Sequence, residues 1–243
     1  MGKNSGAAAC RALSVVFFMV IYFFSAEAAF PQETHSRFEH ISIEQGLSQS
    51  SVNCIIQDHS GFIWIGTADG LNRYDGYSFK VFRSNPLQKK SISDNAVTSM
   101  YVDAGGHLLV GTLLGHLNIY NSDTEEFTRI SLDKILSPDS APESFPDYEY
   151  PMIYARYNDN TITSVYSDNK GILWLGTWGR GLIRYDLKKN DLRVYTHSPS
   201  DKRSISSSRI INITGDSKNN LWVCTFGGGL DKIPLNNSEA DAG

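Results

Sequence analysis

Short segments of alternating apolar and polar residues, separated by turn-forming residues, recur along this chain of 243 residues. Between residues 52 and 57, Val, Cys and Ile alternate with Asn, Ile and Gln, and a β-rich stretch follows from Phe62 to Thr67. Alternation with a period of two predicts β-strands. Apolar residues occur on both faces of the central strands, which favours sheets that lie between two similar sheets.

Four copies of this strand pattern begin near residues 52, 97, 162 and 210. Trp64, Leu109, Trp174 and Trp222 occupy the equivalent position, at spacings of 45, 65 and 48 residues. Repeats of this length with four short antiparallel strands are typical of propeller blades. The alternatives are a β-solenoid, whose coils are normally shorter, and a plain sandwich, which gives no reason to repeat Trp-x-Gly-Thr in one register. We therefore predict an all-β fold, an incomplete β-propeller of about four blades with four antiparallel strands each.

An Asp-x-x-Gly or Asp-x-x-Asn turn separates the first two strands of every unit. Aspartate at the first position can accept backbone N–H bonds, and glycine at the fourth adopts a positive φ without steric cost. Asn219 replaces glycine in the fourth unit, and asparagine also tolerates this conformation. Because the turn repeats, we expect a structural role for it, and we expect the tryptophans to be buried between blades. The predicted structural residues are Trp64, Trp174, Trp222, Asp58, Gly61, Asp168 and Gly171.

The N-terminal residues have the pattern of an export signal. Lys3 and Arg11 precede an apolar run from Leu13 to Phe24, and the small residues Ala26 and Ala28 follow it. This run is short for a membrane-spanning helix, so residues 1–28 are predicted to form a signal peptide helix that is removed; an uncleaved signal anchor is the alternative. We expect a periplasmic or secreted product whose only contact with a membrane is through this signal.

The repeated motif also carries a family resemblance. Asp-x-x-Gly-x-x-Trp-x-Gly-Thr followed by Gly-Leu-x-x-Tyr-Asp runs from Asp58 to Asp75 and, with one residue inserted, from Asp168 to Asp186. This pattern resembles the two-component regulator propeller repeat of periplasmic sensors of bacterial hybrid histidine kinases and some diguanylate cyclases. The opening segment Phe38–Ser48 is similar to the segment that begins such sensors after the signal peptide. The resemblance covers residues 36–234.

The resemblance implies a domain organisation and an expectation about completeness. Members of the family usually carry more repeats, a β-sandwich domain, a membrane helix and a cytoplasmic output module, so we expect an N-terminal fragment or a small secreted remnant that lacks these parts. A strand from Phe38 to Ile43 could close a four-bladed ring as the outer strand of the fourth unit, whereas an open crescent would expose sheet edges. The predicted segments are blades near 48–83, 93–130, 158–197 and 206–234, an inserted loop at 131–157 and a polar tail at 235–243.

Composition and motifs favour recognition over catalysis. Lys and Arg number 22 against 26 Asp and Glu, a formal net charge of −4, which disfavours nucleic acid as a partner. The sequence shows no nucleophile elbow, zinc-protease motif or P-loop, and the six histidines lack metal-ligand spacing. We therefore expect no catalytic residue, no metal and no cofactor. Cys54 and Cys224 are expected to remain free thiols, although closure of the ring would make a disulfide between them conceivable.

Two non-repeated features are candidates for a recognition site. The inserted loop contains four of the eight prolines and, toward its end, four tyrosines at 148, 150, 154 and 157, a composition that suits sugars or peptides. The alternative is that the tyrosines fasten the loop to its blade. Trp178 and Arg180 lie in a turn of the third unit where the other units have smaller residues. The candidate ligand-binding residues are Tyr150, Trp178 and Arg180.

Three functions are weighed against one another. The resemblance implies a non-catalytic extracytoplasmic sensor module of a two-component signal-transduction system, not an enzyme in itself. The composition of the inserted loop suits an oligosaccharide or a peptide as its ligand. Self-association through blade edges, or dimerisation as in sensor kinases, is expected under this interpretation. The alternatives are an exported propeller enzyme that acts on polysaccharide, as a lyase or hydrolase, and a non-functional gene fragment.

Overall fold

The computed structural model describes residues 38–132 and 157–235, and the chain separates into two units, residues 1–40 and 41–243. The predicted signal peptide, the polar tail after Leu235 and most of the inserted loop, with Tyr150, lie outside the described residues. Within residues 38–132 and 157–235, no helix combines the length and apolar character that a bilayer crossing requires.

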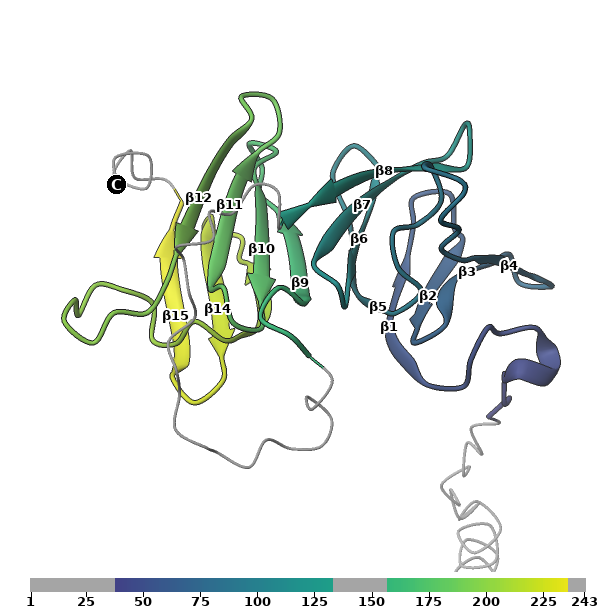
Figure 1. The fold of residues 1–243 in the computed structure, drawn as a ribbon, viewed down its shortest axis with the longest axis horizontal. Coiled ribbons are helices and arrows are strands. Elements are labelled where there is room, and N and C mark those ends of the chain that lie inside the picture. The colour runs from purple at the N-terminus through teal and green to yellow at the C-terminus, as the bar shows by residue number, and fades with distance from the viewer. Residues whose placement is uncertain (1–37, 133–156, 236–243) are drawn as a thin grey trace, which may run out of the picture. The chain divides into compact units, whose positions relative to one another are not determined.

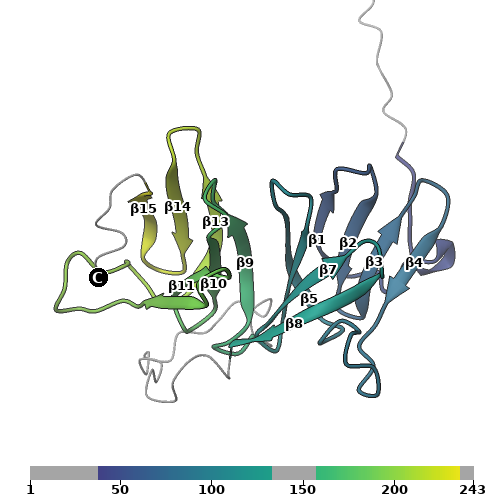
Figure 2. The same cartoon turned by 90° about the horizontal axis from the view of Figure 1, so that it is seen from above.

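Four antiparallel sheets form the second unit, and each contains strands in the order of the chain (Figures 1 and 2). The predicted all-β propeller arrangement is confirmed. The first three sheets have four strands and the described part of the fourth has three. The strands are β1 (Val52–Gln57), β2 (Ile63–Thr67), β3 (Gly70–Tyr74) and β4 (Phe79–Phe82); β5 (Val97–Val102), β6 (Leu108–Thr112), β7 (His116–Asn121) and β8 (Glu126–Ser131); β9 (Ile162–Ser167), β10 (Leu173–Thr177), β11 (Leu182–Asp186) and β12 (Asp191–Tyr195); and β13 (Ile210–Gly215), β14 (Asn220–Thr225) and β15 (Gly229–Pro234).

The segment considered for ring closure does not form a strand. Residues 38–42 have no regular structure, and the 3₁₀ helix η1 (Ile43–Gln45) follows. Ser42 and Gln45 form a reciprocal capping box, and Gly46 ends the turn with φ of 108°. The backbone N–H groups of this segment, which could pair in a sheet ladder, donate instead to acceptors within the local turn.

A hydrophobic core lies between each sheet and the next. Trp64 and Leu71 of the first sheet pack with Val97 and Val110 of the second, and two further clusters join the second sheet to the third and the third to the fourth. We call the face of a sheet that is directed at the next sheet along the chain its forward face, and we use the same name for the equivalent face of the fourth sheet. Trp64 and Trp174 lie on forward faces with 1% and 2% of their surface exposed, whereas Trp222 is half-buried.

Glycine in the second strand lets the next sheet approach closely. A Cβ added at Gly111 would lie 2.6 Å from Cγ2 of Ile162, and one at Gly176 would lie 2.6 Å from Cγ2 of Ile210. Gly66 meets Val97 in the same way. Each contact partner is the first residue of the next sheet, so glycine at this position sets the spacing between sheets.

The same kind of side-chain hydrogen bond joins neighbouring sheets at all three interfaces between them. The second residue of the first strand donates to the carbonyl of the first residue of the next sheet: Asn53 to Val97 at 2.7 Å, Thr98 to Ile162 at 2.6 Å and Thr163 to Ile210 at 2.7 Å. The fourth sheet has Ile211 and Cys224 where the others have this donor and the glycine. Its forward face therefore lacks both features of the three internal interfaces.

Both cysteines among the described residues are free thiols. Cys54 lies on the forward face of the first sheet, in the cluster with Val97, and burial there raises the pKa of its thiol to about 12. Cys224 lies on the forward face of the fourth sheet and is half-buried. The two thiols therefore lie in different sheets, and they are not bonded to each other.

The repeated aspartate fixes its turn and the tryptophan together. One oxygen of Asp168 accepts the backbone N–H groups of Lys170 and Ile172, both at 2.9 Å, and the other accepts the indole N–H of Trp174 at 3.2 Å. The first and fourth sheets repeat this arrangement with Asp58–Trp64 at 2.6 Å and Asp216–Trp222 at 2.9 Å. The residue at the fourth turn position has positive φ, including 91° at Gly61, 77° at Gly171 and 61° at Asn219. In the second sheet the ring of His107 takes the place of the indole beside Asp103.

These bonds predict an acid dependence that can be measured at Asp216. The backbone and side-chain N–H groups of Asn220, and then the indole of Trp222, hold the pKa of this carboxyl well below its usual range. A depressed pKa stabilises the fold fully above the ordinary value near about 4, and this contribution is lost as the pH falls through the folded-state value. Asp216→Asn is expected to lower the urea midpoint at pH 7 and to make its decline below about pH 4 shallower. Asp123→Asn, at an exposed turn, is the control; equal slopes for wild type and Asp216→Asn would contradict the prediction.

Candidate functional site

One end of the blades collects the turns between second and third strands together with the linkers that enter each sheet. Antiparallel order places both kinds of segment at the same end, and the inserted loop leaves and returns there, after Ser131 and before Ile162. We call this the turn end. It comprises the turns 67–70, 112–116, 177–181 and 225–229 and the linkers 46–51, 83–96, 157–161 and 196–209.

A repeated backbone hydrogen bond joins each turn to a linker. The N–H of Leu113 donates to Ala96 at 3.0 Å, that of Trp178 to Thr161 at 3.0 Å, and that of Phe226 to Arg209 at 2.8 Å. Equivalent backbone atoms thus hold the turns of the second, third and fourth blades to the strand entry of their own blade. Only the side chains at these positions differ from blade to blade.

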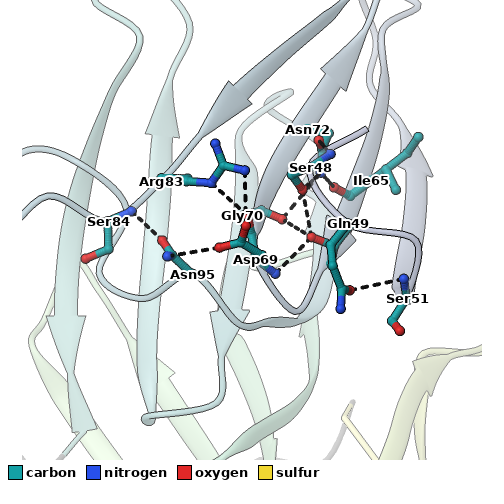
Figure 3. Close-up of polar contacts among 11 residues, drawn as sticks. Ser48, Gln49, Ser51, Ile65, Asp69, Gly70, Asn72, Arg83, Ser84 and Asn95 are labelled. Atoms are coloured by element: carbon teal, nitrogen blue, oxygen red, sulfur yellow. Dashed lines mark hydrogen bonds and ion pairs between the residues drawn. The ribbon is translucent and has the colours of Figure 1, made fainter. Parts of the chain in front are cut away.

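A polar clip in the first blade is also part of the repeated framework (Figure 3). The amide of Asn72 accepts from the N–H of Ser48 and donates to its hydroxyl, both at 2.8 Å, and that hydroxyl also contacts Thr67. Asn118 binds Ser93 in the same way in the second blade, and Asp231 accepts two bonds from Ser206 in the fourth. Repetition in three blades assigns this clip to the fold rather than to a ligand.

Next to this clip, Asp69 connects two parts of the chain (Figure 3). Its carboxylate pairs with Arg83 at 3.1 Å and accepts from the side chain of Asn95 at 3.3 Å, while Asn95 accepts from the N–H of Ser84 at 2.7 Å. The side chains of Asp69 and Arg83 are about half exposed, so the pair contributes little to stability by itself. It orients the linker 83–96 across the turn end.

Non-repeated aromatic and cationic side chains gather at the turn end of the third and fourth blades. The ring of Trp178 lies 5.4 Å from that of Phe226 and 5.7 Å from that of Tyr157, measured between centroids. The guanidinium carbon of Arg209 lies 5.9 Å from the Trp178 ring. At the position of Trp178 and Phe226, the first and second blades carry Ala68 and Leu113. The third and fourth blades therefore differ from the first and second in carrying an aromatic ring at this position.

A cavity of about 300 Å³ opens beside this cluster. Its size is at the lower end of the range of small-molecule sites. The lining combines one arginine, one histidine, hydroxyl groups, an aromatic ring and exposed glycine backbone. The lining residues are His197, Ser206, Ser207, Arg209, Phe226, Gly227 and Gly228.

The structure separates the candidate binding residues predicted from the sequence. Tyr150 lies outside the described residues. Trp178 is only 5% exposed, so its ring is packed within the cluster and does not present a face to solvent. Arg180 is directed at the linker that precedes the third blade, where its Nε donates to Asn160 at 3.0 Å. Among the residues predicted to be structural, Trp64, Trp174 and Trp222 bind their turn aspartates as described above.

Sequence reasoning missed Arg209, Phe226 and His197. Phe226 could have been found by comparing the residue after the conserved threonine position of each unit, where Ala, Leu, Trp and Phe occur in turn. Arg209 and His197 lie in a linker and come to the cavity only through folding. In residues 38–132 and 157–235, no group of three or more His, Cys, Asp or Glu side chains is arranged to hold a metal ion.

Comparisons with known proteins agree with the repeat structure. The model of the family "Two component regulator propeller" matches residues 46–69 and 156–179. A segment of 78 residues, 32% of this chain, is 44% identical to Histidine kinase P4 of Formosa agariphila and spans 6% of that protein.

Solved structures share the fold. The extracellular domain of the putative hybrid two component system BT4673 from B. thetaiotaomicron superposes with a TM-score of 0.58 at 24% identity, over 77% of this chain and 22% of that one. The WD40 beta propeller domain of Doa1 superposes with a TM-score of 0.52 at 11% identity, over 79% of this chain and 54% of that one. The chain thus spans 6% of the histidine kinase, less than a quarter of the BT4673 domain and about half of the Doa1 domain.

Proposed function

From the premise that this chain carries two component regulator propeller repeats, we propose that it is a non-catalytic, extracytoplasmic ligand-binding module of a two-component signal-transduction system. The repeats supply a rigid frame, and the turn end of the third and fourth blades supplies the binding site. The observation that carries the proposal is the cluster of Trp178, Phe226 and Arg209, because these side chains occupy repeated positions that differ in the other blades.

The comparisons support the setting of this role. The matched relative is named a histidine kinase, and the BT4673 structure is an extracellular domain of a putative two-component system. An export signal at residues 1–28 would bring this chain to the periplasm or the medium. Aromatic rings beside hydrogen-bonding and cationic groups suit an oligosaccharide or a peptide as the ligand. In this role a cytoplasmic module would generate the signalling output. The chain would self-associate through its blade edges or dimerise as sensor kinases do.

Binding without turnover is the expected result when the full chain is screened against arrays of oligosaccharides and peptides. Hits are then measured by titration calorimetry and recovered for mass spectrometry, and we expect the ligand to come back unchanged. Trp178→Leu should weaken binding, and Trp222→Leu, the same substitution outside the turn end, should leave it intact. Release of shortened or unsaturated sugars from polysaccharide would contradict the proposal and support the lyase or hydrolase alternative. Binding that persists in Trp178→Leu would place the site elsewhere.

A further inference from the structure

The outer edge of the fourth sheet is prepared for one more strand. In the first three sheets β4, β8 and β12 pair with the third strand, whereas β15 is the last described strand of the fourth (Figure 2). We infer that this edge binds an extended segment of a partner polypeptide, in which an aromatic residue is followed two positions later by arginine. This surface for a protein partner goes beyond the proposed function, which concerns a ligand at the turn end.

The second blade shows how a linker receives the outer strand. In β8, the N–H of Phe127 donates to the carbonyl of Lys90 at 2.8 Å. The guanidinium of Arg129 donates to the carbonyl of Ser91 at 2.6 Å and to that of Gln88 at 3.0 Å. The ring of Phe127 is 4% exposed and packs in the cluster between the first two sheets. The sequence Phe-x-Arg of β8 therefore matches the linker that enters the same blade.

The linker of the fourth blade repeats this conformation. In residues 85–92 and 198–205 the hydroxyl of Ser91 or Ser204 accepts the N–H of the first residue, at 2.8 and 2.9 Å, and donates to its carbonyl, at 3.2 and 3.1 Å. Two backbone bonds of 3.0 or 3.1 Å complete each turn. The carbonyls of Arg203 and Ser204 correspond to the two that β8 binds through Phe127 and Arg129. Among the described residues, neither carbonyl accepts a hydrogen bond.

β15 presents backbone groups for the same strand. The N–H of Leu235 points toward β14, where it donates to the carbonyl of Asn219 at 3.0 Å. Because backbone groups alternate in direction along an antiparallel strand, the N–H groups of Leu230 and Lys232 lie on the outer edge. Their equivalents in β7 lie opposite β8. The edge therefore offers two N–H donors, and the linker offers two carbonyl acceptors.

The side chain of Asp231 favours arginine in the incoming strand. Asn118 lies opposite Arg129 in the second sheet, and Asp231 takes the position of Asn118 in the fourth. One oxygen of Asp231 accepts the N–H and the hydroxyl of Ser206, at 2.9 and 2.8 Å, and within the described part of the chain the other oxygen has no partner. Opposed side chains of antiparallel strands lie close together, so this oxygen can pair with the arginine.

Neither a second copy of β15 nor the residues after it fit this edge well. Antiparallel pairing centred on the middle of two β15 strands places Asp231 opposite Asp231 or Lys232 opposite Lys232, and like charges in such pairs are destabilising. Lysine and proline on an edge strand also oppose pairing between copies. Residues 236–243 contain neither an aromatic residue nor an arginine. A partner polypeptide is therefore the source of the strand.

The test measures binding of a labelled peptide that copies residues 124–132, which include β8, to the full chain by fluorescence anisotropy. We expect this peptide to bind about tenfold or more tightly than the same peptide with Arg129→Gln, and a scrambled peptide not to bind. In the chain, Lys232→Pro removes one outward N–H and should weaken binding about tenfold. Lys232→Ala keeps that N–H, so it is the matched control and should bind within about twofold of wild type.

A second variant keeps the test decisive if Lys232→Pro does not fold, as melting temperatures would show. Asp231→Asn introduces the residue that the first two blades carry, so the bonds to Ser206 are retained, and the preference for the arginine peptide should fall to about threefold or less. A preference that Asp231→Asn leaves unchanged would overturn the inference.

Three further results would also overturn it. The first is no binding of the β8 peptide at about 1 mM, and the second is equal binding of the arginine, glutamine and scrambled peptides. The third is unchanged binding by folded Lys232→Pro. A dimer of the free chain that the peptide dissociates would instead assign the edge to a second copy and overturn the choice of a partner polypeptide. None of these results decides the proposed function, which depends on the array screen and on Trp178→Leu.

Discussion

Replacing Trp174 by alanine is expected to lower the free energy of unfolding by about 3–5 kcal/mol, the usual cost of removing a buried tryptophan. The indole is 2% exposed and lies in the cluster that joins the third sheet to the fourth, among Leu182, Ile210 and Leu221. Its N–H also satisfies one oxygen of Asp168, which the substitution would leave without this donor. Because typical domains are stable by only about 5–15 kcal/mol, this one change removes a large fraction of the total.

Urea unfolding followed by tryptophan fluorescence and circular dichroism measures this effect. Trp222→Ala is the matched control, because Trp222 makes the same bond to its turn aspartate but is half-buried, with Lys232 over its ring at 5.2 Å. We expect its loss to be clearly smaller than that of Trp174→Ala. Similar losses at both positions would show that the aspartate bond, and not burial between sheets, accounts for the stabilisation.

The architecture could be predicted because its determinants are local and repeated. The turn aspartate recurs in all four units, and a tryptophan follows it by six residues in three of them, so one mechanism explains three of the four copies. The exception in the second blade, where His107 stands beside Asp103, occupies a different offset from Trp64 and its equivalents. A residue comparison at aligned positions does not reveal this replacement.

The site could be predicted only in part. Trp178 was visible as a large side chain in a turn, but its burial depends on contacts with Tyr157 and Phe226 that form on folding. Arg209 and His197 lie at opposite ends of the linker 196–209, which has no periodic pattern, and they meet at the cavity because this linker folds back against the turn 225–229. The sequence pattern also does not show that residues 38–43 form no strand. A local capping box of Ser42 and Gln45 competes there with sheet pairing.

A second large loss of stability is expected where a new side chain would disturb the spacing between two sheets. Gly176→Ala is expected to cost about 1–3 kcal/mol, because its Cβ would lie 2.6 Å from Cγ2 and 3.0 Å from Cβ of Ile210. These atoms belong to a branched side chain at the start of β13, so relief requires movement of the whole fourth sheet against the third. At the equivalent position of the fourth blade, Cys224→Ala is expected to change stability by less than about 0.5–1 kcal/mol, because that half-buried side chain has no such neighbour among the described residues.

A double substitution separates this clash from a general intolerance of β10 to alanine. Ile210→Ala alone removes buried methyl groups and is expected to cost about 2–5 kcal/mol. In Gly176→Ala/Ile210→Ala the Cγ2 that lies 2.6 Å from the new methyl group at position 176 is gone, so the combined loss in urea unfolding should be smaller than the sum of the single losses by about 1 kcal/mol. Additive losses would mean that contact with Ile210 does not require glycine at position 176. A smaller combined loss would establish that the close approach of Ile210, whose carbonyl also accepts the hydrogen bond from Thr163, requires glycine at position 176.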